Sequence, residues 1–286
     1  MRSTVTTAHR TTLTAVDEPM SKTCGYAPVN GLEMYYQIEG TGDPLVYIPA
    51  AFGFAGFPSF PTLMQSHSVI TMDLQGHGRT ADIPERQLSI EQYGRDVVGL
   101  LTYLGIPKAD FFGHSYGGAT AVWIAAHHPE LVRRVATYGA TFGPPAIAHN
   151  TRMLRYDSPP TPDARAFDFK KKRYEQVAPD PDYWPHIWEK VATMKWDGFA
   201  REELASLEAP VLIVLGDHDF VRLDHAVATF ELIPNAELSV IPDAGHFAPL
   251  SEQERILPIV RHFLEKPPER ISVATAGMGF HPGETR

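Results

Sequence analysis

In the stretch ADFFGHSYGGAT, residues 109–120, the pattern changes from that of a strand to that of a helix at Ser115. The residues before the serine are typical of a strand buried on both faces, and the residues after it begin a helix that we expect to reach about His128. Gly113 and Gly117 bracket the serine in the pattern G-x-S-x-G. A sharp turn from strand to helix crowds the backbone, and this explains glycine on both sides of the serine.

Two interpretations of Ser115 follow from this stretch. In the first, the hydroxyl of Ser115 only caps the helix, as serine often does. In the second, Ser115 is a nucleophile, and the free amides at the start of the helix favour a negative charge that forms beside it. Capping explains the serine but not the two glycines, so the stretch favours the nucleophile.

Along the rest of the chain, short apolar runs alternate with longer amphipathic segments. We expect strands over 44–49, 68–74, 109–114, 131–140, 209–216 and 236–242, and helices over 89–104, 116–128 and 222–232. An Asn-Gly turn within 26–40 predicts a hairpin, and Ser251 with Glu254 predicts a capping box for the last helix. This order predicts an α/β fold, in which a mostly parallel central sheet is flanked by helices and has the hairpin at one edge.

The partners that a serine nucleophile needs also follow predicted strands. A serine hydroxyl is a weak nucleophile, which requires a base that a third group orients. Asp217 and Asp219 come directly after the strand at 209–216, and His246 follows the next strand. Because the carboxyl ends of parallel strands meet at one edge of a sheet, we expect these side chains to gather near Ser115.

The sequence resembles the α/β-hydrolase superfamily over almost all of residues 30–264. The resemblance rests on four motifs in the expected order: GHSYG (113–117), DLQGHGRT (73–80), GDHDFV (216–221) and DAGHFAPLSEQE (243–254). It implies that Ser115 is the nucleophile, His246 the base and Asp219 the acid. By the same resemblance, Asp217 braces its loop, the DLQGHGRT loop is structural support and His114 is a packing residue.

The resemblance further implies that the serine's oxyanion is held by two backbone amides, those of Ala51 and Tyr116. Relatives usually carry His-Gly in the loop after the strand at 44–49, whereas this chain reads Pro49-Ala50-Ala51-Phe52-Gly53. Proline has no amide to donate, and alanine at position 50 restricts a backbone that glycine leaves free. This loop is the one clear departure from the family's pattern.

We expect a core domain over 22–142 and 198–266, a helical cap over 143–197, a disordered leader over 1–21 and a flexible tail over 267–286. The cap's tryptophans either pack it against the core or line a substrate pocket. Its run Lys170-Lys171-Lys172-Arg173 is expected to be a solvated helix face. The expected pocket residues are Phe52, Trp184, Trp188, Phe220 and Phe247.

Composition limits the partners of this protein. The chain has 286 residues with a net charge of −9, and this acidity argues against nucleic acid and anionic membranes as partners. No apolar run approaches the ~20 residues that span a bilayer. Cys24 is the only cysteine, and no H-E-x-x-H spacing occurs among the 13 histidines. We therefore expect a cytoplasmic monomer or homodimer that acts on a small molecule and needs no metal or cofactor.

These features predict a carboxylesterase-like serine hydrolase, which cleaves an ester of a small apolar or aromatic substrate through an acyl-enzyme. Three related reactions could use the same triad: hydrolysis of a carbon–carbon bond, opening of a lactone, and perhydrolysis. A protein of another class, which senses a ligand without hydrolysing it, also remains open. The sequence does not separate these alternatives.

Overall fold

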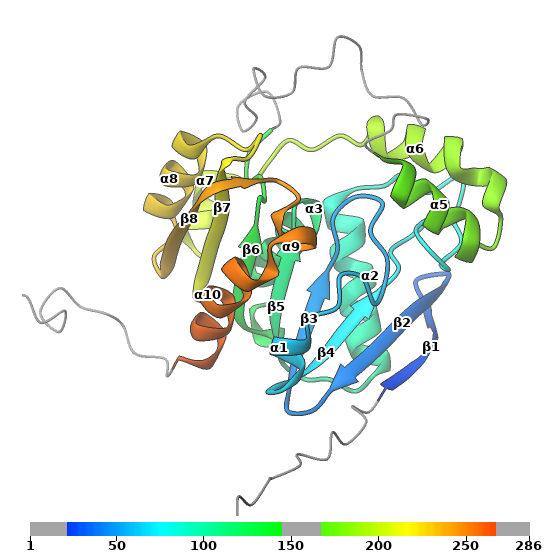
Figure 1. Cartoon of the computed structure of the whole chain (residues 1–286), viewed down its shortest axis with the longest axis horizontal. Helices are drawn as coiled ribbons and strands as arrows, with labels where there is room; N and C mark the ends of the chain where they lie inside the picture. Colours follow the sequence, from blue (N-terminus) through cyan, green and yellow to red (C-terminus); the bar gives the residue numbers. More distant parts are fainter. Residues whose placement is uncertain (1–21, 145–166, 267–286) are drawn as a thin grey trace, which may run out of the picture.

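The computed structural model describes residues 22–144 and 167–266 (Figure 1). The predicted leader over 1–21, the predicted tail over 267–286 and the part of the predicted cap over 145–166 lie outside the described residues. The expected domain boundaries therefore stay predictions.

The described residues contain one eight-stranded sheet with the order β1-β2-β4-β3-β5-β6-β7-β8. Its strands are β1 (Lys22–Val29), β2 (Leu32–Gly40), β3 (Asp43–Ile48), β4 (His67–Met72), β5 (Ala109–His114), β6 (Val132–Tyr138), β7 (Val211–His218) and β8 (Ala236–Gly245). The pairs β1–β2 and β2–β4 are antiparallel, and all the other pairs are parallel. The predicted α/β class, with a hairpin at one edge of the sheet, is confirmed.

Helices cover both faces of this sheet (Figure 1). The described α-helices are α1 (Pro61–Met64), α2 (Ile90–Tyr103), α3 (Tyr116–His127), α5 (Asp168–Val177), α6 (Trp184–Ala192), α7 (Arg201–Ala205), α8 (Leu223–Leu232), α9 (Ala248–Ser251) and α10 (Gln253–Glu265). Buried residues of α2, α3 and α8 belong to one apolar cluster, and those of α1, α9 and α10 belong to another. No helix in these two described segments is long and apolar enough to cross a membrane.

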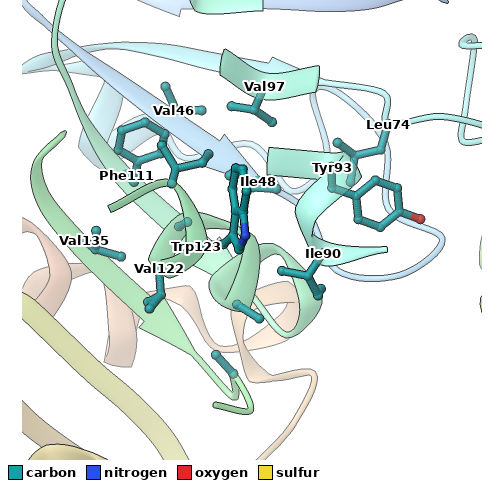
Figure 2. Packing of buried hydrophobic residues seen from close by; sticks show 14 of the residues in the cluster. Val46, Ile48, Leu74, Ile90, Tyr93, Val97, Phe111, Val122, Trp123 and Val135 are labelled. Atoms are coloured by element: carbon teal, nitrogen blue, oxygen red, sulfur yellow. The ribbon is translucent and has the colours of Figure 1, made fainter. Parts of the chain in front are cut away.

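Figure 2 shows the first cluster, in which Val46 of β3 lies beside Phe111 of β5. These two residues are direct partners in the parallel ladder. Trp123 of α3 packs so close to α2 that a Cβ at Gly94 would lie 2.1 Å from its ring. Continuous apolar strands are required here because helices cover the sheet on both faces.

The local sequence signals were mostly correct. Asn30 and Gly31 both have positive φ, at 48° and 85°, as a two-residue hairpin turn requires. Ser89 caps α2 by accepting a hydrogen bond from the amide of Gln92 at 3.1 Å. The capping box at Ser251 is wrong: Ser251 is the last residue of α9, and α10 begins after an N-cap at Glu252 whose side chain makes no cap hydrogen bond.

The described part of the predicted cap is the helix pair α5 and α6, which lie together in Figure 1. As the spacing of its tryptophans predicts, α6 buries Trp184, Ile187, Trp188 and Val191 on one face. Lys190 on the same helix forms a salt bridge of 2.7 Å with Asp82, a carboxylate whose side chain is 2% exposed. A buried ion pair therefore joins the cap helices to the loop after β4.

Candidate active site

Ser115 occupies a strained turn between β5 and α3. Its φ is 56° and its ψ −122°, a combination that is costly for a residue with a side chain. The flanking glycines are required, because a Cβ at Gly113 would lie 2.3 Å from the oxygen of Gly117, and one at Gly117 would lie 2.1 Å from the oxygen of Ile48. The side chain of Ser115 makes no cap hydrogen bond to α3, so the capping interpretation is wrong.

His246 and Asp219 form a buried pair at the ends of β7 and β8. His246 Nδ1 lies 2.9 Å from Asp219 Oδ1, and the two residues are 7% and 2% exposed. The same carboxylate oxygen also accepts a hydrogen bond from the amide of Val221 at 3.0 Å. A carboxylate only accepts hydrogen bonds, so Nδ1 is the donor in this contact and Nε2 is the ring nitrogen that can act as a base.

Three contacts place this pair near the turn that holds Ser115, although no hydrogen bond in the described residues joins the Ser115 hydroxyl to His246. The amide of Ser115 donates to the backbone oxygen of Tyr138 at 2.9 Å. The next residue, Gly139, lies so close to the pair that a Cβ there would be 2.7 Å from both Asp219 Oδ2 and His246 Nδ1. His114, directly before the serine, donates from Nε2 to the backbone oxygen of His246 at 2.8 Å.

His114 is a packing residue, as expected. Burial lowers its pKa well below the usual value, and the positive charges that His246 and Lys170 can carry act in the same direction. A neutral His114 can hold the loop of His246 through its hydrogen bond without adding a charge beside it. Asp217 braces its loop, because its carboxylate accepts a hydrogen bond from the amide of Ala244 at 3.3 Å.

The DLQGHGRT loop is support as well, through Asp73. This buried carboxylate accepts from the amide of Arg79 at 2.7 Å and from its guanidinium at 3.1 Å. It also accepts a hydrogen bond from the amide of Ala55, just beyond the loop that follows β3. Gly78 has a φ of 52° and lies against the Asp73 carboxylate, where a Cβ would come within 2.3 Å. Asp73 thus ties this loop to the residues that follow Gly53.

The loop after β3 is a tight turn. The amide of Gly53 donates to the oxygen of Ala50 at 2.8 Å, and Phe52, inside the turn, has a φ of 58°. Within the described residues, no hydrogen bond uses the amide of Ala51. The amide of Tyr116, the first residue of α3, has no acceptor inside the helix. Both amides named by the sequence resemblance are therefore available to a ligand.

Two cavities adjoin this loop, and neither is lined by Ser115, Asp219 or His246. The larger is lined by Pro49, Ala50, aromatic residues of the loop and His114, the residue before the serine. The smaller extends toward Gly76 and Ile187. Both are lined by Phe52, Phe54 and Lys170.

Of the expected pocket residues, Phe52 lines both cavities and the other four line neither. Trp184 and Trp188 are buried, and each has its ring centroid 5.0 Å from that of Phe52. In the described residues, these tryptophans pack the cap against the loop after β3. Phe220 and Phe247 instead contact His246, with ring centroids at 3.8 and 5.3 Å.

The sequence pattern does not predict the inward orientation of Lys170. We expected the whole run 170–173 to face solvent, but the ammonium of Lys170 points inward and donates to the backbone oxygen of Ala51 at 2.5 Å. Lys172 is exposed, as expected. One signal was present: Phe167, Lys170 and Tyr174 share one face of the helix at helical spacing, and the two aromatic residues mark that face as the inner one.

Within residues 22–144 and 167–266, no group of three or more His, Cys, Asp or Glu side chains is arranged to hold a metal ion.

Comparisons with known proteins agree on one family. A sequence model of the alpha/beta hydrolase family matches residues 40–258. The chain is 29% identical over 273 residues to 2-hydroxymuconate semialdehyde hydrolase of Pseudomonas sp. strain CF600, a match that covers 82% of this chain and 91% of the relative.

Two solved structures share the fold. One is 2-hydroxy-6-oxo-6-phenylhexa-2,4-dienoate hydrolase from Rhodococcus sp. strain RHA1, with a TM-score of 0.71, 22% identity, and 87% of this chain and 100% of that chain covered. The other is an enol-lactonase from Burkholderia xenovorans LB400, with a TM-score of 0.67, 25% identity, and 84% and 100% covered.

Proposed function

We propose that this chain, which belongs to the alpha/beta hydrolase family, hydrolyses a carboxylic ester of a small apolar substrate. The reaction passes through an acyl-enzyme. The observation that carries this proposal is the pair His246–Asp219, joined at 2.9 Å and buried at the strand ends beside the Ser115 turn. A serine, an aspartate and a histidine that follow β5, β7 and β8 in this order are the set of residues used in acyl transfer.

In the proposed reaction, His246 Nε2 takes the proton of the Ser115 hydroxyl while Oγ attacks the carbonyl carbon of the substrate. Asp219 holds the imidazole in the required tautomer and stabilises the imidazolium that forms. The amides of Ala51 and Tyr116 donate to the oxyanion. His246 then protonates the leaving alcohol, and it later takes a proton from the water that releases the carboxylic acid and restores Ser115.

The lining of the larger cavity supports an apolar substrate, because most of it is aromatic or aliphatic. Small-molecule sites are lined mainly by side chains of this kind, with a few polar groups that fix the orientation of the ligand.

A second candidate reaction keeps the same residues but cleaves a carbon–carbon bond next to a carbonyl. One specific observation favours it: the relative that is 29% identical over most of its length bears the name of a semialdehyde hydrolase. In this reaction the leaving group is a stabilised carbanion, which must be protonated at carbon and not at oxygen.

A turnover panel tests both reactions. The panel contains neutral p-nitrophenyl esters of increasing acyl length, an enol lactone and a vinylogous 1,5-diketone, each with the wild type and with Ser115→Ala. The proposal expects multiple turnovers on short esters that Ser115→Ala loses. Turnover of the diketone alone would select the second candidate. Tight binding with no turnover of any substrate would favour a ligand-sensing protein and contradict both reactions.

A further inference from the structure

Lys170 carries a cation into the active-site region from the cap helix α5. Its ammonium donates to the backbone oxygen of Ala51 at 2.5 Å and lies 5.6 Å from the ring centre of Phe247, which itself contacts His246. Among the described residues, no carboxylate forms a salt bridge with it. An ammonium that is partly buried and not paired with an acid is costly, so its position needs an explanation.

The acceptor of this hydrogen bond lies in the middle of a strained turn. The turn runs from Ala50 to Gly53, and Ala51 and Phe52 are its two central residues. Phe52 has a φ of 58°, a conformation that suits glycine and is disfavoured for phenylalanine. Rotation of the peptide between Ala51 and Phe52 is the movement that interconverts turns with negative and positive φ at the third residue.

Two cap contacts oppose that rotation. Lys170 holds the carbonyl of this central peptide, and the ring of Phe52 stacks on Trp188 with an interplanar angle of 9°. Both come from the cap, and both hold the peptide that directly follows the one carrying the Ala51 amide, so they fix the turn as a whole.

We propose that Lys170 is a positioning residue, whose hydrogen bond to the Ala51 carbonyl locks the turn that presents the oxyanion amide. The inference rests on the proposed function, because it assigns a task to the amide of Ala51. It implies that the cap does more than shape the cavity: it completes the catalytic loop of the core.

Burial lowers the pKa of Lys170 to about 8. The titratable groups that line the two cavities together with Lys170 are Tyr47, His77 and His114 of the core and Tyr174 of its own helix. Burial lowers the pKa of His77 to about 4 and that of His114 well below its usual value, with a further contribution from the charge on Lys170. Burial raises the pKa of Tyr47 and of Tyr174. These four groups therefore stay neutral while Lys170 loses its proton.

The test compares Lys170→Met, which keeps the length of the side chain without the charge, with Lys170→Arg and with Lys172→Met, an exposed control on the same helix. The substrate is a neutral short p-nitrophenyl ester, so that no substrate anion can pair with Lys170. We expect Lys170→Met to lower kcat by about tenfold or more with little change in KM, since the loss of one oxyanion donor costs ~10²–10³ in kcat. Lys170→Arg should recover most of the loss, and Lys172→Met should match the wild type.

The pH profile gives a readout that a merely structural lysine would not move. The wild-type kcat should fall as pH rises through about 8, because the neutral amine holds the carbonyl less strongly. Lys170→Arg should lack this alkaline limb, because arginine keeps its charge. Thermal unfolding of each variant separates loss of the turn from loss of the fold.

Three outcomes overturn the inference. These are an unchanged kcat in a folded Lys170→Met, the same alkaline limb in Lys170→Arg, and a defect that appears only as a raised KM, which would make Lys170 a substrate-binding residue. If the wild type hydrolyses no ester, the proposed function itself fails. The two failures are therefore distinguishable.

Discussion

At the scale of single residues, the site depends on close contacts that leave no room for a side-chain atom. Gly139 has a φ of 56°, and a Cβ at this position would lie 2.7 Å from both Asp219 Oδ2 and His246 Nδ1. This glycine belongs to no recognised motif, yet it sets the distance between β6 and the histidine–aspartate pair. A residue can therefore be essential to the geometry without taking part in the chemistry.

Gly139→Ala should lower kcat by at least about 10²-fold, since a displacement of about 1 Å at the reacting groups can cost that much. The reason is that the new methyl group must push His246 or Asp219 aside. The measurement is steady-state ester hydrolysis, together with a thermal melt to show that the protein is folded. Gly105→Ala is a matched control, because Gly105 also has positive φ, at 67°, but has no atom within 4 Å of its Cβ position. Equal activity of the two variants would contradict the contact.

Asp219→Asn should lower kcat by roughly 10⁴-fold, because an amide can donate to Nδ1 and so favour the wrong tautomer of the imidazole. Asp217→Asn is the internal comparison, since Asp217 contacts the amide of Ala244 and not His246. It should retain most of the activity. The reverse order of the two effects, measured as kcat on one ester, would show that the acid has been assigned to the wrong aspartate.

At the scale of elements, the cap helices are joined to the core at two places by lysine. Lys170 of α5 binds the turn after β3. Lys190 of α6 binds Asp82 and the backbone oxygens of Ile83 and Arg86 in the loop after β4. Both lysines extend from the cap into the core. The packing of the cap on the core therefore depends on charged hydrogen bonds as well as on buried apolar surface.

Lys190→Met should destabilise the folded protein by about 3–5 kcal/mol, because it leaves the Asp82 carboxylate buried without its partner. Urea unfolding measures this difference, with Lys195→Met as an exposed control. A change no larger than that of the control would mean that the ion pair does not join cap and core.

This stability should also depend on pH. Burial by itself raises the pKa of Asp82, but hydrogen bonds from Lys190, Gln75 and Tyr183 outweigh it and hold the pKa below the usual value. A carboxyl with a depressed folded-state pKa stabilises the fold above its unfolded pKa of about 4, and this contribution is lost as pH falls through the lower folded value. The stability gap between wild type and Lys190→Met should therefore shrink at acidic pH. A gap that widens there would contradict this account of Asp82.

At the scale of the whole molecule, most of the fold could be predicted from the sequence. The parallel strands appear in the sequence mostly as apolar runs bounded by turn residues, a pattern typical of strands that are buried on both faces. The edge hairpin of β1 and β2 is marked by its Asn-Gly turn instead. The edges of elements were less certain: Ser251 has the spacing of a capping box, but the short helix α9 uses it as its final residue. The spacing of a capping box alone cannot show that the same serine is already the last residue of another short helix.

The site was predictable where it lies at strand ends and not where two distant segments meet. Ser115, Asp219 and His246 each follow a strand, so topology alone brings them to one edge of the sheet. Lys170 lies in a run of cations, a pattern that favours a solvated surface. Only the packing of α5 on the loop after β3 turns its ammonium inward.

The central claim is that the pair His246–Asp219 activates Ser115 as a nucleophile. Covalent labelling with a neutral fluorophosphonate, mapped by peptide mass spectrometry, tests it most directly because the probe reacts only with an activated hydroxyl and needs no knowledge of the substrate. The account predicts one label per chain, on Ser115, which is absent in Ser115→Ala and slow to form in Asp219→Asn. An unlabelled wild-type protein, or a label on another residue, would contradict it.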